Sequence, residues 1–178
     1  MHATLIPHPT TAIGPVAFIQ VELVREGAGL WLRFTAEGDV DRVLWPDPAT
    51  AARVDELWRH TCFEVFVRTP DGYREYNLSP SGQWASYAFD GYRNGMRDAG
   101  EVATLEPLDG ASDQVALEAR IQLPPDALAL GLSAVVEDVD GGVSYWALAH
   151  PSDKPDFHHP DSFTLVLPAF GTAGRDPA

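Results

Sequence analysis

Three short runs of alternating residues, separated by two tight turns, constrain the fold of this chain more than any other feature. The runs are 61–68, 73–79 and 83–89, and the turns between them read Thr-Pro-Asp-Gly and Ser-Pro-Ser-Gly. Successive side chains of a strand point to opposite faces, and proline with aspartate, serine and glycine is typical of tight turns. Residues 61–89 therefore predict three consecutive antiparallel strands, a β-meander.

Two carboxylates lie in the middle of this meander. Alternation places Glu64 on the same strand face as Cys62 and Phe66, and Glu75 on the same face as Tyr73. An unpaired buried charge is costly, so each carboxylate needs solvent, a partner or a ligand cavity. We expect Glu75 to face solvent, because most glutamates do. For Glu64, the pattern favours neither solvent nor a cavity.

Further alternating runs flank the meander. They cover 16–34, 115–122, 132–150 and 162–167, and the partial alternation near residue 16 indicates a β-bulge. Residues 47–58 begin with Asp-Pro and continue with alanines, so we predict one short helix there. About ten alternating strands can bury their apolar faces only in packed or closed sheets. The predicted fold class is all-β, a two-sheet antiparallel β-sandwich of jelly-roll or immunoglobulin-like type with one short helix.

The length and patterning favour a single domain. A chain of 178 residues can bury one sizeable core, and no linker or repeat interrupts 14–167. We expect the domain to span 1–178, with the sandwich core in 14–167, an irregular arm at 1–13 and an irregular tail at 168–178.

Charge and hydropathy exclude several function classes. The net charge of −14 argues against binding to nucleic acid or anionic membranes, because both need a basic patch. No apolar run is long enough to span a bilayer, and the first residues lack the basic and apolar regions of a signal peptide. The lone Cys62 excludes an internal disulfide and fits a reducing compartment. We therefore expect a cytoplasmic protein whose partner is a small molecule.

The loop 150–161 contains three histidines and three aspartates. Imidazole and carboxylate groups together can bind a divalent metal, although their spacing here matches no standard zinc motif. The same histidines can instead hydrogen-bond a ligand hydroxyl. Because adjacent residues in an extended loop point apart, we expect only one of His158 and His159 to reach a given site.

Tryptophan and tyrosine are plentiful around the meander. Flat rings that line a cleft, with carboxylate, amide or lysine groups at the edge, suit a neutral polar ligand such as a sugar. Trp58 and Trp84 are the candidates, and core packing is the alternative for each. The chain has no phosphate-binding loop, no GxGxxG and no GxSxG, so no residue is assigned a catalytic role.

Taken in order, the segments LWRHTCFEVFV, YREYNLSPSGQWASYAF, YRNGM and HPSDKPDFHHPDSF resemble the DOMON-like proteins related to family 9 carbohydrate-binding modules. The resemblance covers most of 16–167. It implies an immunoglobulin-type jelly-roll sandwich that binds a sugar or haem and is not itself catalytic. Haem-binding relatives use a methionine and a histidine as axial ligands, and Met96 is the methionine available here.

The sequence thus predicts a non-catalytic module that binds a small, carbohydrate-like ligand. Two alternatives stay open, a metal-assisted enzyme built on the loop 150–161 and a haem or redox-ligand module. The cofactor of either would be a divalent metal or haem. The expected ligand-binding residues are Trp58, His60, Glu64, Asn77, Trp84, His150, Lys154, Asp156, His158 and His159.

Overall fold

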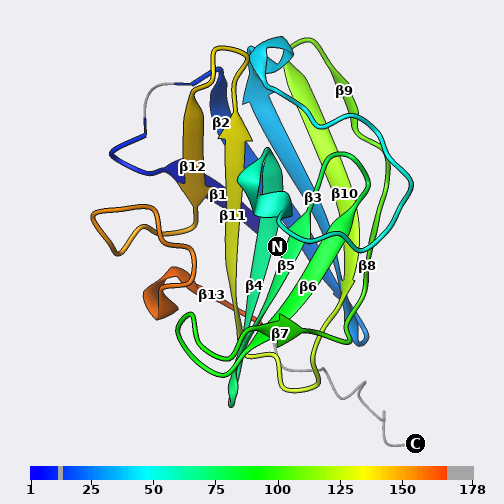
Figure 1. Cartoon of the computed structure of the whole chain (residues 1–178), viewed down its shortest axis with the longest axis vertical. Coiled ribbons are helices and arrows are strands. Elements are labelled where there is room, and N and C mark those ends of the chain that lie inside the picture. Colours follow the sequence, from blue (N-terminus) through cyan, green and yellow to red (C-terminus); the bar gives the residue numbers. More distant parts are fainter. Residues whose placement is uncertain (12–13, 168–178) are drawn as a thin grey trace, which may run out of the picture.

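The computed structural model describes residues 1–11 and 14–167, and the elements in those residues are strands and 3-10 turns (Figure 1). The 3-10 turns are η1 (Val40–Arg42), η2 (Leu57–Arg59) and η3 (Pro160–Ser162). The strands are β1 (His2–Pro7), β2 (Val16–Glu26), β3 (Gly29–Gly38), β4 (Cys62–Thr69), β5 (Gly72–Leu78), β6 (Trp84–Phe89), β7 (Arg97–Asp98), β8 (Ala103–Leu105), β9 (Asp109–Ala111), β10 (Gln114–Gln122), β11 (Ala129–Glu137), β12 (Val143–Ala147) and β13 (Leu165–Val166).

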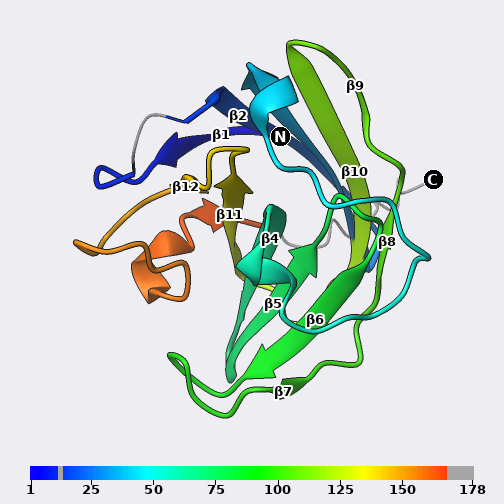
Figure 2. The ribbon, with the colours of Figure 1, turned by 45° about the horizontal axis from the view of Figure 1, so that its top comes forward.

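All strand pairs are antiparallel, and the strands form one strongly curled sheet. Their order is β7-β6-β5-β4-β11-β12-β1-β2-β3-β10-β8, with β13 on β11 and β9 on β10. β1 pairs with both β12 and β2, so it joins the two halves of the sheet. In Figure 2, the half containing β2, β3 and β10 curls over the half containing β11, β4, β5 and β6. Two packed layers result, which confirms the predicted all-β sandwich.

The core fills the space between the layers. Phe63 and Val65 of β4 and Tyr76 of β5 point into it, and the ring of Phe63 lies 4.9 Å from that of Phe34 on β3. The opposite faces of β4 and β5 therefore point away from the core. The alternation in the sequence predicts this division of the meander into two faces. The layer that contains β4 and β5 therefore has an outer face that does not contribute to the main core.

The expected irregular arm is wrong, because His2–Pro7 form β1. Within this strand, only the side chain of Leu5 is buried. A single buried residue leaves no alternation of apolar and polar residues in the sequence, so the segment is not recognisable as a strand. The predicted bulge is confirmed by a register shift between Val16 and Phe18. The expected tail at 168–178 lies outside the described residues.

The predicted helix at 47–58 is also wrong. The segment runs beside the start of β6, where Trp84 donates its N–H to the carbonyl of Ala52 and accepts one from Val54. The N–H of Ala49 similarly binds the carbonyl of Ser81. These tertiary hydrogen bonds replace intrahelical ones, so the good helix propensity of the alanines does not decide the conformation. Only the 3-10 turn η2 forms in this range.

Tyr76 ties the two layers together, since its hydroxyl donates to the carbonyl of Gln122 in β10 at 2.5 Å. We expect Tyr76→Phe to lower the free energy of unfolding by about 1 kcal/mol, because the carbonyl loses its partner. Urea unfolding measures this loss. Tyr145→Phe is the control, because no hydrogen bond of the Tyr145 hydroxyl is found within 1–11 and 14–167. Equal losses in the two variants would contradict the assignment.

No helix in the described part of the chain is long and apolar enough to cross a membrane.

Candidate ligand-binding site

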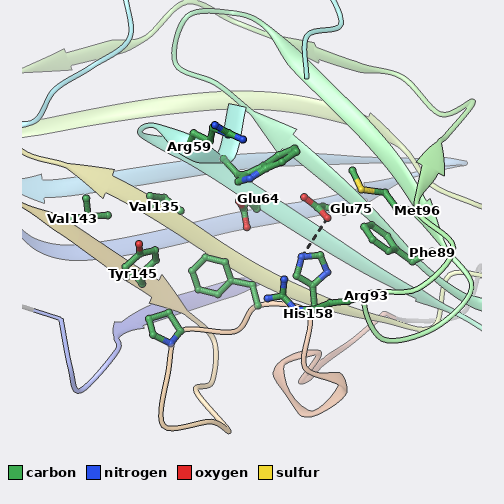
Figure 3. Close-up of a pocket in the computed structure, with 13 residues that line it drawn as sticks. Arg59, Glu64, Glu75, Phe89, Arg93, Met96, Val135, Val143, Tyr145 and His158 are labelled. Atoms are coloured by element: carbon green, nitrogen blue, oxygen red, sulfur yellow. Dashed lines mark ion pairs between the residues drawn. The ribbon is translucent and has the colours of Figure 1, made fainter. Parts of the chain in front are cut away.

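A cavity of about 660 Å³ opens on the outer face of β4, β5, β11 and β12 (Figure 3). Its floor consists of strand residues, and its walls come from η2, from the segment 89–96 and from the loop 155–158. Its lining residues are Trp58, Arg59, Glu64, Glu75, Phe89, Arg93, Met96, Val135, Val143, Tyr145, Pro155, Phe157 and His158.

Glu64 and Glu75 lie together on the floor of this cavity (Figure 3). Glu64 is opposite Asn77 in the β4–β5 register, which makes the two glutamates diagonal neighbours on one face. Their exposed fractions are only 3% and 4%. Ser133 Oγ donates to Glu64 Oε2 at 3.1 Å, and Asn77 Nδ2 donates to Glu75 Oε1 at 2.8 Å. The expected solvent exposure of Glu75 is wrong, because His158 and its loop cover this part of β5.

Burial dominates the electrostatics of the floor. Burial raises the pKa of Glu75 to about 7, although the hydrogen bond from Asn77 and the positive charge of Arg93 both lower it. It also raises the pKa of Glu64 well above its ordinary value, and the nearby Glu75 charge adds to that shift. Two carboxylates that share a low-dielectric site disfavour each other's ionisation. The pair therefore retains a proton near neutral pH.

His158 connects the floor to the rim through a short chain of polar groups. The backbone N–H of Arg93 donates to Tyr73 Oη at 3.2 Å, and Tyr73 Oη lies 2.8 Å from His158 Nδ1. Burial, then Arg93, lowers the pKa of His158 to about 4, and burial raises the pKa of Tyr73 to about 12. Both side chains are therefore neutral at pH 7. Their hydrogen bond occupies Nδ1 of the imidazole, and the other ring nitrogen, Nε2, lies 3.7 Å from Glu75 Oε2.

Asp156 holds together the two segments that form the rim of the cavity. Its carboxylate accepts hydrogen bonds from Arg93 Nη2 at 2.9 Å, from Tyr92 Oη at 2.7 Å and from the N–H of His158 at 3.2 Å. These bonds join the segment 90–96 to the loop 150–162. The other rim cation, Arg59, pairs with Glu56 at 2.8 Å. Both rim arginines are thus matched by carboxylates that do not line the cavity.

Aromatic rings form the walls. Trp58 projects from η2 and meets Tyr87 edge-on at 5.8 Å between ring centroids. Across the cavity, Tyr145 of β12 lies 6.2 Å from Phe157. Packing against neighbouring rings and the floor restricts these side chains, so the walls are formed without a ligand.

Five of the ten predicted residues belong to this site. Trp58, Glu64 and His158 line the cavity, whereas Asn77 and Asp156 hydrogen-bond to lining residues from behind. The early tryptophan segment and the late histidine loop therefore meet at one cavity.

The other five predicted residues lie elsewhere. His60 pairs with the glutamate that ends β11, and His150 bonds a carbonyl of β1. Trp84 packs against the main core, Lys154 is exposed, and His159 accepts the backbone N–H of Asp161 at η3. As their adjacency predicts, only one of the two neighbouring histidines, His158, lines the cavity.

Several lining residues were missed by sequence reasoning. Tyr145 carries a usable signal, because it alternates with the core residue Trp146 along β12 and so points outward. Phe157 and Arg93 lie in loops, where no periodicity marks a residue as part of a site.

The loop histidines do not gather into a metal site. In residues 1–11 and 14–167, no group of three or more histidine, cysteine, aspartate or glutamate side chains is arranged to hold a metal ion.

Haem does not fit the histidine of the cavity. Met96 and His158 both line it, as a Met–His axial pair would require. However, an axial histidine must direct a free ring nitrogen at the iron. Nδ1 of His158 is bonded to Tyr73, and Nε2 faces Glu75.

No family model matches this chain, and a search of curated proteins gives no match either.

Proposed function

We propose that the protein is a non-catalytic, DOMON-like module that binds a small carbohydrate-like ligand in the outer-face cavity. The observation that supports this function is one preformed cavity with aromatic walls over a floor of buried carboxyl groups. Its volume of about 660 Å³ lies within the range of small-molecule sites.

The chemistry of the lining suits a sugar. Trp58, Tyr145 and Phe157 offer flat apolar surface for the C–H face of a pyranose. A carboxyl pair that retains a proton can both donate to and accept from ligand hydroxyls. The contacts of Asp156 hold the loop wall in place before a ligand arrives, which lowers the entropic cost of binding.

We expect Trp58→Ala to weaken saccharide binding by about tenfold or more, which corresponds to ~1.4 kcal/mol, because a wall of the cavity is lost. Calorimetric titration with a panel of mono- and disaccharides measures this effect. Trp31→Ala is the matched control, since Trp31 alternates with core residues of β3 and lies on the outer face of the other layer. Absence of any saccharide binding at millimolar concentration would contradict the proposed function.

A further inference from the structure

The floor carboxylates lack a fixed cationic partner. In the part of the chain that the structure describes, no lysine or arginine forms an ion pair with Glu64 or Glu75. The near neighbours of the Glu75 carboxyl group are the Asn77 amide and the neutral His158, and the hydrogen bond found for Glu64 is the one from Ser133. The two rim arginines are paired with Asp156 and Glu56. The deepest part of the cavity is therefore acidic, with its charge suppressed by a bound proton.

The surroundings of this acidic floor favour a cation over a neutral group. The aromatic rings of Trp58, Phe89, Tyr145 and Phe157 line the same cavity, and the faces of such rings attract ammonium groups. A buried carboxylate also gains more from a bonded ammonium than from a hydroxyl, because the opposite charge compensates a charge that is costly to leave unpaired in the interior. The aromatic rings and the carboxylates thus both favour a cationic group over a neutral one.

We propose that the cavity selects ligands that carry a protonated primary amine, of the amino-sugar class, and that the ammonium group binds between Glu64 and Glu75. This inference rests on the proposed saccharide function and specifies its ligand. The aromatic walls contact the sugar ring, while the floor carboxylates accept the ammonium hydrogens.

Binding of the amine is coupled to release of a proton. The titratable groups around the carboxyl pair are Arg59 on η2, Cys62 on β4, Tyr73 on β5, Arg93 on the segment 90–96, Tyr145 on β12 and His158 on the loop, with Asp156 behind Arg93. Among them, His158 and Tyr73 stay neutral from pH 5 to pH 7, because their pKa values are about 4 and about 12. The proton that leaves is therefore the one held by the glutamates, and the affinity for an amine rises with pH up to about 7.

Glucosamine and glucose test the inference, because they differ by an amine in place of one hydroxyl. We expect glucosamine to bind at least about tenfold more tightly than glucose at about pH 6.5, and its dissociation constant to weaken by up to about tenfold per pH unit below that. Glucose binding should change little. Calorimetry in two buffers of different ionisation enthalpy should detect proton release with glucosamine only.

Glu64→Gln and Glu75→Gln are expected to remove the preference for glucosamine, and Glu106→Gln, an exposed residue outside the cavity, should keep it. Equal affinity of the wild type for the two sugars, without proton release, would overturn the inference and leave the saccharide function standing. Binding of neither sugar would overturn both. Proton-linked binding of n-butylammonium without any saccharide binding would support the amine site and contradict the saccharide function. The wild-type comparisons decide the question even if a variant fails to fold.

Discussion

Gly72→Ala is expected to lower the free energy of unfolding by at least about 3 kcal/mol. Gly72 starts β5 with a φ of +138°, a region essentially reserved for glycine. A Cβ at this position would also lie 2.0 Å from the carbonyl oxygen of Phe89, a backbone atom that cannot move without disturbing β6. The strand pair that carries Glu75 and Phe89 would have to separate, so ligand binding should be lost together with stability.

Urea unfolding of Gly72→Ala against Gly100→Ala measures this effect. Gly100 has ordinary backbone angles and no heavy atom within 4 Å of the added Cβ, so its variant should stay within about 0.5 kcal/mol of the wild type. If the two variants are equally stable, the close approach of Gly72 to β6 is not a feature of the folded protein.

The meander was predictable because burial imposes a period of two on its sequence. Phe63 and Val65 alternate with Cys62 and Glu64, and the structure places these two pairs on opposite faces of β4. The alternation identifies the faces without saying what covers them. The cover on the outer face comes from distant loops, so the burial of Glu75 could not be read from its own strand.

The predicted residues that do belong to the candidate site were predictable for a related reason. Trp58 lies directly before the meander, and His158 lies in the loop with the densest set of polar side chains, so both stand out locally. Asp156 lies in the same polar loop, but its partner Arg93 is 63 positions away, and nothing in the sequence around residue 93 marks it as part of the site. The helix predicted at 47–58 failed in the same way, because its hydrogen-bond partners Ser81 and Trp84 lie in the turn between β5 and β6 and at the start of β6.

Glu75→Gln is expected to stabilise the protein at about pH 8 by on the order of 3 kcal/mol and to have little effect at about pH 4.5. The pKa of Glu75 rises from its ordinary 4.5 to about 7 on folding, because burial disfavours the charged form. Below pH 4.5 the group is protonated in both states. Between about pH 4.5 and about pH 7, the unfolded state is ionised while the folded state keeps its proton, so the free energy of unfolding falls as the pH rises and levels off above about 7.

Urea unfolding of wild type and variant between about pH 4.5 and about pH 8 tests this sign, with Glu106→Gln as the control for loss of an exposed carboxylate. Groups outside the carboxyl pair titrate equally in the wild type and the variant, so the difference between the two proteins reports on the pair. In the variant, Glu64 keeps the upward pKa shift caused by burial but loses the part caused by the Glu75 charge, which adds to the stabilisation of the variant at high pH. A stability difference that does not grow with pH would mean that Glu75 has a permanent cationic partner, and the acidic floor proposed for amine recognition would then be already neutralised.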